Sequence, residues 1–212
     1  QAGHDRFNHN WYRVHDLLVL PTGETRADLL ANHHLFYPET EEMCSVIHKT
    51  PIELVGGSVA FTTGEWEEVY RVNSCVHLPD YDWSFDGHMS GGRMLPLGED
   101  HILVTVGDFA LAEFHFDPDT VMDPGNDLGK IIKVDLNTGE GSGYATGVRN
   151  PQGFAWDAEG RLWETEHAAQ GGDEVNLIKE GAHYGWPFVS VGAAYGSPRG
   201  EFELNPVQGR HE

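Results

Sequence analysis

The chain has 212 residues, of which 39% are hydrophobic, with 13 lysine and arginine residues against 34 aspartate and glutamate residues. A formal net charge of −21 would repel phosphate backbones, which excludes nucleic acid as an expected partner. No apolar run approaches the ~20 residues of a membrane span, so we expect none.

The content of 26 Gly and 11 Pro, together with 6 Trp, 7 Tyr and 10 Phe, favours many short strands and tight turns. It predicts an all-β fold, and the even composition predicts a single domain over residues 1–212. The chain begins at Gln1 without an initiator Met or a signal-like stretch, as expected of a processed or partial chain. Cys44 and Cys75 could form a disulfide in an oxidising compartment, or could equally be free and buried.

The first quarter of the chain, residues 1–51, shows strand-like pieces around residues 11–20 but no repeat. Residues 58–61 and 68–72 have the pattern of strands in the blade that precedes the repeat described next.

A weak internal repeat follows, because residues 94–105 align without gaps onto residues 154–165, at an offset of 165 − 105 = 60. Each copy has an apolar strand, an acidic turn and a second apolar strand, a pattern that predicts a β-hairpin. Between the copies, residues 129–136 alternate in polarity and predict the outer part of the same unit. Two hairpins at a fixed period predict neighbouring β-propeller blades.

At about 60 residues a unit, this chain holds about three to four blades, whereas closed propellers contain about four to eight. We therefore expect an incomplete propeller. Further sequence beyond Glu212 or a second chain would complete the ring.

Five sequence elements follow one another in the second half of the chain and carry the chemistry. They are His88–Met94, Thr105–Asp108, Gly147–Trp156, Glu166–Ile178 and Gly181–Pro187. Together they resemble the soluble glucose/sorbosone dehydrogenase family over about residues 68–187. The resemblance implies a six-bladed β-propeller with pyrroloquinoline quinone (PQQ) at the mouth of its channel, held partly by calcium.

The resemblance places a catalytic base at His88 and its orienting carboxylate at Asp108. Alcohol oxidation needs a base whose pKa lies near the working pH, and a carboxylate keeps the imidazole in one tautomer. His88 could otherwise be an ordinary loop histidine, one of 13 in the chain, so its assignment as the base depends on the linked motif. Relatives often carry Asp where Gly87 stands, so a contact to the base is missing unless Asp86 replaces it.

Arg149 and Asn150 match the family residues beside the quinone oxygen, where a fixed cation and an amide donor stabilise growing negative charge. The same residues, followed by Pro151, could simply form a turn. Both roles are compatible in a loop on a rigid scaffold.

For calcium, the resemblance implies the consecutive backbone carbonyls of Ala168 and Ala169. The family commonly has Gly-Pro there, and the absence of the proline removes a constraint on the backbone φ of this loop. A second calcium site would use the Glu174 carboxylate and the Tyr184 carbonyl, with Asp173 nearby. Its alternative is a surface Asp-Glu pair that binds nothing.

These elements predict PQQ-dependent, calcium-assisted oxidation of an aldose or related sugar by base-assisted hydride transfer, in the periplasm or outside the cell. The remaining quinone ligands of the family would lie beyond Glu212. One alternative is a non-catalytic calcium-binding propeller that serves as an extracellular interaction or assembly module. Another is a calcium-dependent propeller hydrolase.

Overall fold

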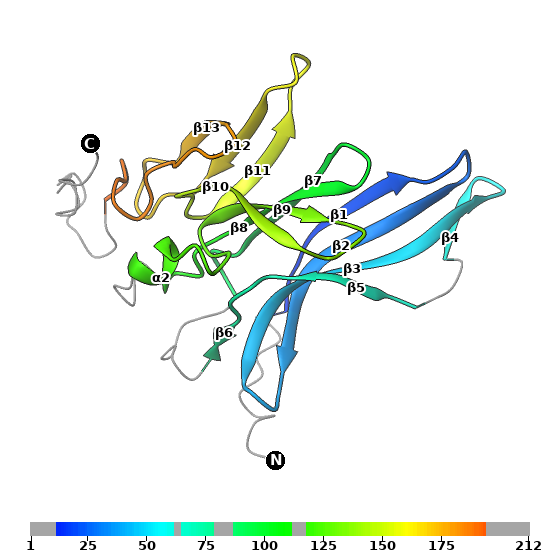
Figure 1. The fold of residues 1–212 in the computed structure, drawn as a ribbon, viewed down its shortest axis with the longest axis horizontal. Coiled ribbons are helices and arrows are strands. Elements are labelled where there is room, and N and C mark those ends of the chain that lie inside the picture. Colours follow the sequence, from blue (N-terminus) through cyan, green and yellow to red (C-terminus); the bar gives the residue numbers. More distant parts are fainter. Residues whose placement is uncertain (1–11, 62–64, 79–86, 112–117, 194–212) are drawn as a thin grey trace.

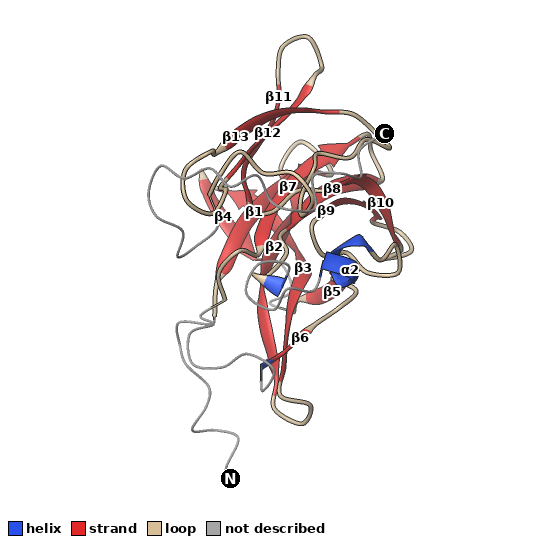
Figure 2. Cartoon of the chain, turned by 90° about the vertical axis from the view of Figure 1, so that its left-hand side faces the viewer, coloured by secondary structure: helices blue, strands red, loops and turns tan. Residues whose placement is uncertain are grey.

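The computed structural model describes residues 12–61, 65–78, 87–111 and 118–193, and regular structure in these ranges is almost entirely β-strand (Figures 1 and 2). The named helix in these ranges is the five-residue α2 (Pro118–Met122). The all-β prediction is therefore confirmed. No helix among the described residues combines the length and the apolar character needed to cross a membrane.

The first sheet is built around its long third strand. It contains β1 (Val14–Pro21), β2 (Arg26–Tyr37), β3 (Glu42–Val55), β4 (Ser58–Phe61), β5 (Glu67–Arg71) and β6 (Val76–His77). The order is β1-β2-β3, and β4, β5 and β6 each pair with β3. A disulfide between Cys44 and Cys75 ties β3 to the residue before β6. Of the two alternatives for the cysteines, the structure has the bonded one.

The second and third sheets are meanders in sequence order. The second contains β7 (Gly91–Leu97), β8 (His101–Val106), β9 (Lys130–Asp135) and β10 (Gly141–Thr146), and the third contains β11 (Pro151–Trp156), β12 (Leu162–Glu166) and β13 (Glu174–Ile178). The pair Pro96 and Ile102 in β7–β8 has its counterpart, 60 residues on, in Trp156 and Leu162 of β11–β12. The repeat seen in the sequence is thus a repeat of strand register.

The first strand of each sheet carries a bulge at the same place relative to the second strand. The register shifts between Val14 and Asp16 in β1, between Gly91 and Met94 in β7, and between Pro151 and Gly153 in β11. The first sheet therefore belongs to the same repeat, although its sequence shows none.

The three bulged strands lie next to one another and form the inner side of the assembly (Figure 1). Arg93 of β7 joins them, because its Nε donates to the Gln152 carbonyl of β11 at 2.7 Å and its Nη1 lies 3.4 Å from the Asp16 carboxylate of β1. The three sheets are consecutive blades of a β-propeller, as predicted. The strands expected to be innermost, β8 and β12, are second in their blades.

Apolar side chains fill the two spaces between adjacent blades. One cluster joins the first and second sheets, with Leu30 and Ile47 against Ile102 and Ile132. Leu103 and Ile131, on the opposite face of the second sheet, pack with Leu162 and Ile178 of the third. The second sheet is covered on both faces, which explains why β8 is a nearly continuous apolar run.

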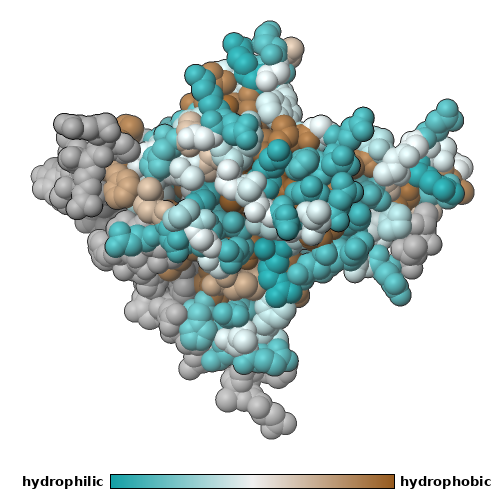
Figure 3. All heavy atoms as spheres, in the orientation of Figure 1, coloured by the Kyte–Doolittle hydropathy of each residue, from teal (hydrophilic) through white to brown (hydrophobic). Residues whose placement is uncertain are grey.

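The outer blades each leave one apolar face uncovered by the described residues. In β13, Val175 is 68% exposed and Leu177 is 37% exposed; in β1, Leu17 and Val19 are also exposed. Figure 3 shows that the face of the molecule in this view is mostly hydrophilic, with smaller patches of hydrophobic residues. The uncovered faces are the places where further blades of a ring would pack.

Candidate functional site

The loops that precede the first strands and follow the second strands meet at one end of the second and third blades. The Met89 carbonyl accepts the Phe109 amide at 3.0 Å, and the Asp108 amide donates to the Arg149 carbonyl at 3.0 Å. The structure thus brings four predicted residues to one end of the blades: the buried Asp108 and Arg149 and the half-buried His88 and Asn150. Asp86 lies outside the described residues.

Gly107 allows two of these loops to touch. A Cβ atom at this position would lie 1.9 Å from the Met89 carbonyl oxygen and 2.6 Å from its carbonyl carbon. The neighbouring atoms are backbone, which cannot swing aside as a side chain can. A glycine is needed here because of contact with Met89.

We expect Gly107→Ala to destabilise the fold by at least about 2 kcal/mol, because the added methyl forces the His88–Met89 segment away from Asp108. Chemical denaturation of the purified variant measures the change. Gly143→Ala in β10 is the control, since its Cβ would have no atom within 4 Å. Equal stability of the two variants would contradict the close approach.

Asp108 is fully buried, and both of its carboxylate oxygens accept hydrogen bonds. One comes from the Ala110 amide and the other from the Trp186 indole nitrogen, each at 2.9 Å. The Arg149 guanidinium lies 5.3 Å from the centre of the Trp186 ring, a cation–π contact. Trp186 therefore links the carboxylate to the cation. The motif containing Trp186 was visible in the sequence, but this role was not predicted.

Arg149 is held rigidly, with only 2% of its surface exposed. Its Nη1 donates to the His167 carbonyl at 2.9 Å, and its Nη2 lies 3.5 Å from the Met89 sulfur. The backbone amides of Arg149 and Asn150 both donate to one carboxylate oxygen of Glu166. Glu166, which sequence reasoning left without a role, thus fixes the loop that presents the guanidinium.

Four polar residues of β12 and β13 share the face that points toward the second blade. The register pairs Glu164 with Asn176 and Glu166 with Glu174, on the same side as the core pair Leu162 and Ile178. Burial raises the pKa of Glu164 to about 8, and the negative charge of Glu166 adds to the effect. Burial also raises the pKa of Glu166 to about 7, although the amides that it accepts oppose this. A bound proton or a nearby cation would therefore stabilise these carboxyl groups.

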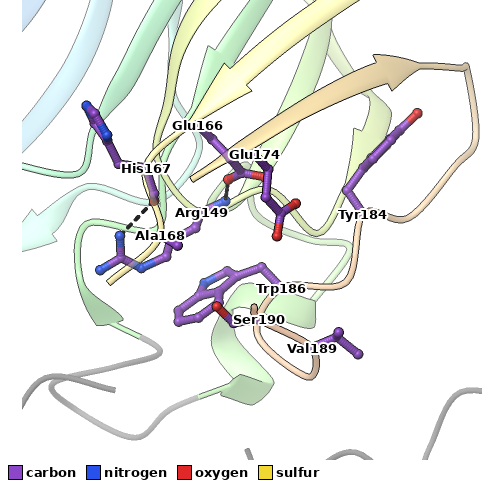
Figure 4. A pocket seen from close by; sticks show the side chains of 9 residues that line it. All are labelled: Arg149, Glu166, His167, Ala168, Glu174, Tyr184, Trp186, Val189 and Ser190. Atoms are coloured by element: carbon purple, nitrogen blue, oxygen red, sulfur yellow. Dashed lines mark hydrogen bonds between the residues drawn. The ribbon is translucent and has the colours of Figure 1, made fainter. Parts of the chain in front are cut away.

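A pocket opens beside these carboxylates (Figure 4). Its lining residues are Arg149, Glu166, His167, Ala168, Glu174, Tyr184, Trp186, Val189 and Ser190. The Glu174 carboxylate points into the pocket, whereas the Tyr184 ring points away from it. The Tyr184 hydroxyl instead donates to the Leu177 carbonyl and accepts the Lys179 amide, both at 2.8 Å.

Asp173 stabilises the loop that follows β12. Its carboxylate accepts the Ala168 amide at 3.2 Å and lies 3.2 Å from His167 Nδ1, and the bond with His167 lowers the Asp173 pKa. Ala168 and the partly exposed Ala169 belong to this loop. The backbone of Gln170, in the same loop, exchanges two hydrogen bonds with the backbone of Ala193. Asp173 is thus engaged with the loop itself.

The carboxylates of Glu166 and Glu174 line the pocket, and carboxylate oxygens are ligands that a hard cation prefers. Within the described ranges, however, no three His, Cys, Asp or Glu side chains stand in a ready-made metal-binding arrangement. The pocket brings Arg149, Ala168, Glu174 and Tyr184 together, and Asp173 is not among its lining residues.

Comparison with known proteins gives a family match over most of the functional half. The family model described as glucose/sorbosone dehydrogenase matches residues 80–208. The aldose sugar dehydrogenase YliI of Escherichia coli is 30% identical over 124 residues, which cover 51% of this chain and 32% of the relative. Quinoprotein glucose dehydrogenase B of Acinetobacter calcoaceticus is 47% identical over 47 residues, which cover 22% of this chain and 10% of the relative.

Solved structures extend the likeness of fold to nearly the whole chain. The apo form of the soluble aldose sugar dehydrogenase of Escherichia coli superposes with a TM-score of 0.65 at 20% identity, covering 89% of this chain and 53% of that one. A glucose dehydrogenase structure gives a TM-score of 0.68 at 20% identity, covering 90% and 54%. The chain spans about half the length of these structures and about a third of the YliI relative.

Proposed function

The chain belongs to the glucose/sorbosone dehydrogenase family, and on this basis we propose that it contributes the catalytic half of a PQQ-dependent sugar dehydrogenase. The substrate would be an aldose or a related sugar. The observation that carries the proposal is the fixed Arg149 guanidinium beside the loops of His88 and Asp108. A base and a cation at one end of the blades are what oxidation of an alcohol requires.

His88 would accept the proton of the sugar hydroxyl that is oxidised. Both carboxylate oxygens of Asp108 accept hydrogen bonds, and a carboxylate in this loop would stabilise a protonated imidazole nearby. Trp186 keeps this carboxylate in place. PQQ, when bound, supplies the acceptor for the two electrons of the sugar.

Arg149 would stabilise the negative charge that develops at the acceptor. Its guanidinium is already oriented by the His167 carbonyl and the Trp186 ring, so little reorganisation is needed. Asn150 would present its side chain beside it, with its Oδ1 fixed by Gln152 at 2.7 Å.

Calcium would be held by oxygen donors along the same loops. Ala168 and Ala169 would contribute backbone carbonyls, and Glu174 with the Tyr184 carbonyl would form the second site. The position of Glu174 in the pocket supports this assignment. Asp173 would support the first loop through its bond to the Ala168 amide.

Further blades would cover the exposed faces that include Val175 and Leu177 in the third sheet and Leu17 and Val19 in the first. They would come from more of the same polypeptide or from another chain. A periplasmic or extracellular location fits the disulfide between Cys44 and Cys75, because such bonds persist in oxidising compartments.

The test is reconstitution of the purified full-length protein with PQQ and calcium, followed by dye reduction with a panel of aldoses. We expect aldose-dependent reduction that requires both PQQ and calcium. Absence of turnover with every sugar, despite bound PQQ, would contradict a sugar dehydrogenase.

A further inference from the structure

We propose that Glu164 is a cation ligand, and that it completes a carboxylate site with Glu166 and Glu174 on the buried face of β12–β13. The inference rests on the proposed calcium role of Glu174 and adds a residue to it. The family resemblance assigns no function to position 164.

The three carboxylates converge on a single amide. Asn176 Nδ2 lies 3.1 Å from Glu164 Oε2, 3.2 Å from Glu166 Oε1 and 3.4 Å from Glu174 Oε2. An amide nitrogen carries two hydrogens, so it can donate one good hydrogen bond to at most two of the three. The Asn176 amide therefore cannot satisfy all three carboxylates, which favours a cation bound among the carboxylate oxygens.

Glu164 adds a second, independent observation that favours a cation here. The residue is fully buried, and its Oε1 atom has no hydrogen-bond partner. A buried carboxylate oxygen without a partner is unfavourable by the full cost of removing it from water. The carboxyl group that carries this oxygen is directed at the Asn176 amide, where Glu166 and Glu174 also point.

A divalent hard cation is the ligand whose chemistry fits. Calcium accepts six to eight oxygens with flexible geometry, and carboxylates can bind it through one or both oxygens. In the present arrangement, the amide nitrogen of Asn176 occupies the point of convergence. A half-turn of the amide group would present Oδ1 in its place and add a fourth oxygen donor. Within the described ranges the three carboxylates do not stand in a ready-made metal-binding arrangement, so binding would draw their oxygen atoms closer together.

Calcium titration of the full-length protein after chelation tests the proposal. Isothermal calorimetry would compare the native protein with Glu164→Gln, which keeps the shape of the side chain and removes its charge. We expect the dissociation constant for calcium to rise about tenfold or more, because the ligand charge falls by one. Glu180→Gln is the matched control, since Glu180 is exposed beyond the end of β13 and should bind calcium as the native protein does.

Thermal unfolding separates a loss of binding from a loss of folding. Without calcium, Glu164→Gln should melt no lower than the native protein, because glutamine needs neither a proton nor a cation to neutralise it. With calcium, its melting temperature should rise less than that of the native protein. Glu164→Leu, which removes the charge and the oxygen atoms together, should behave in the same way.

The outcomes distinguish the role of Glu164 from the calcium site of the proposed function, on which it rests. Native affinity in Glu164→Gln, with binding lost in Glu174→Gln, would overturn the role of Glu164 and leave the calcium site of the proposed function intact. No calcium binding by the native protein would overturn both.

Discussion

Replacement of His88 by alanine should reduce aldose oxidation by about 10²–10⁴-fold while leaving the fold intact, because loss of a general base has typical effects of this size. His88 is half-buried in the loop before β7, and its neighbour Met89 makes the backbone contact with Phe109. That contact does not depend on the imidazole. The measurement is steady-state dye reduction with saturating PQQ and calcium.

His101→Ala is the matched control for this variant. His101 is the first residue of β8, directly after the β7–β8 turn, and its Nε2 lies 3.6 Å from the Asp135 carboxylate, at the opposite end of the strand from the loops of the site. It should retain the native rate. If His88→Ala also oxidises sugar at the native rate, the base is another residue.

Replacement of Arg149 by lysine should lower the turnover number by about 10²-fold or more, because removal of one preorganised donor to a developing charge has this effect. Lysine keeps the positive charge but loses the planar group that contacts both the His167 carbonyl and the Trp186 ring. The expected change is mainly in the turnover number, as the interaction strengthens when charge develops.

Arg161→Lys is the control for this substitution. Arg161 lies in the exposed turn of the third blade, paired with Asp157 and Glu159. A turnover number for Arg149→Lys equal to that of Arg161→Lys would show that Arg149 serves the loop and not the reaction.

The sequence carried enough information to place two of the three blades. The repeat at 60 residues predicted the hairpins of β7–β8 and β11–β12, because both copies keep the same apolar and turn positions. Residues 58–61 and 68–72 were predicted as strands of the preceding blade, and they correspond to β4 and β5 of the first sheet. The repeat itself was not found there, since the first sheet resembles the others in the bulge after Val14 and not in residue types. A shared bulge position cannot be recognised in the sequence when the strands around it differ in length and in residue types.

The site was predictable where chemistry is encoded in linked motifs, and not where it depends on packing. The motifs pointed to Arg149 and Asp108, but the indole of Trp186 that joins them comes from a loop 78 residues from Asp108. Glu164 looked like an ordinary strand residue. Only the register of β12 with β13 shows that its side chain is buried on the same face of the sheet as Glu166, Glu174 and Asn176.

The measurement that tests the central claim most directly is the absorption spectrum of the PQQ-loaded protein before and after an aldose is added without oxygen or dye. The account predicts that the bound quinone is reduced within the time of one turnover, and that His88→Ala with the same PQQ content reduces it at least about 100-fold more slowly. A quinone spectrum that stays unchanged when every aldose is added would contradict the account.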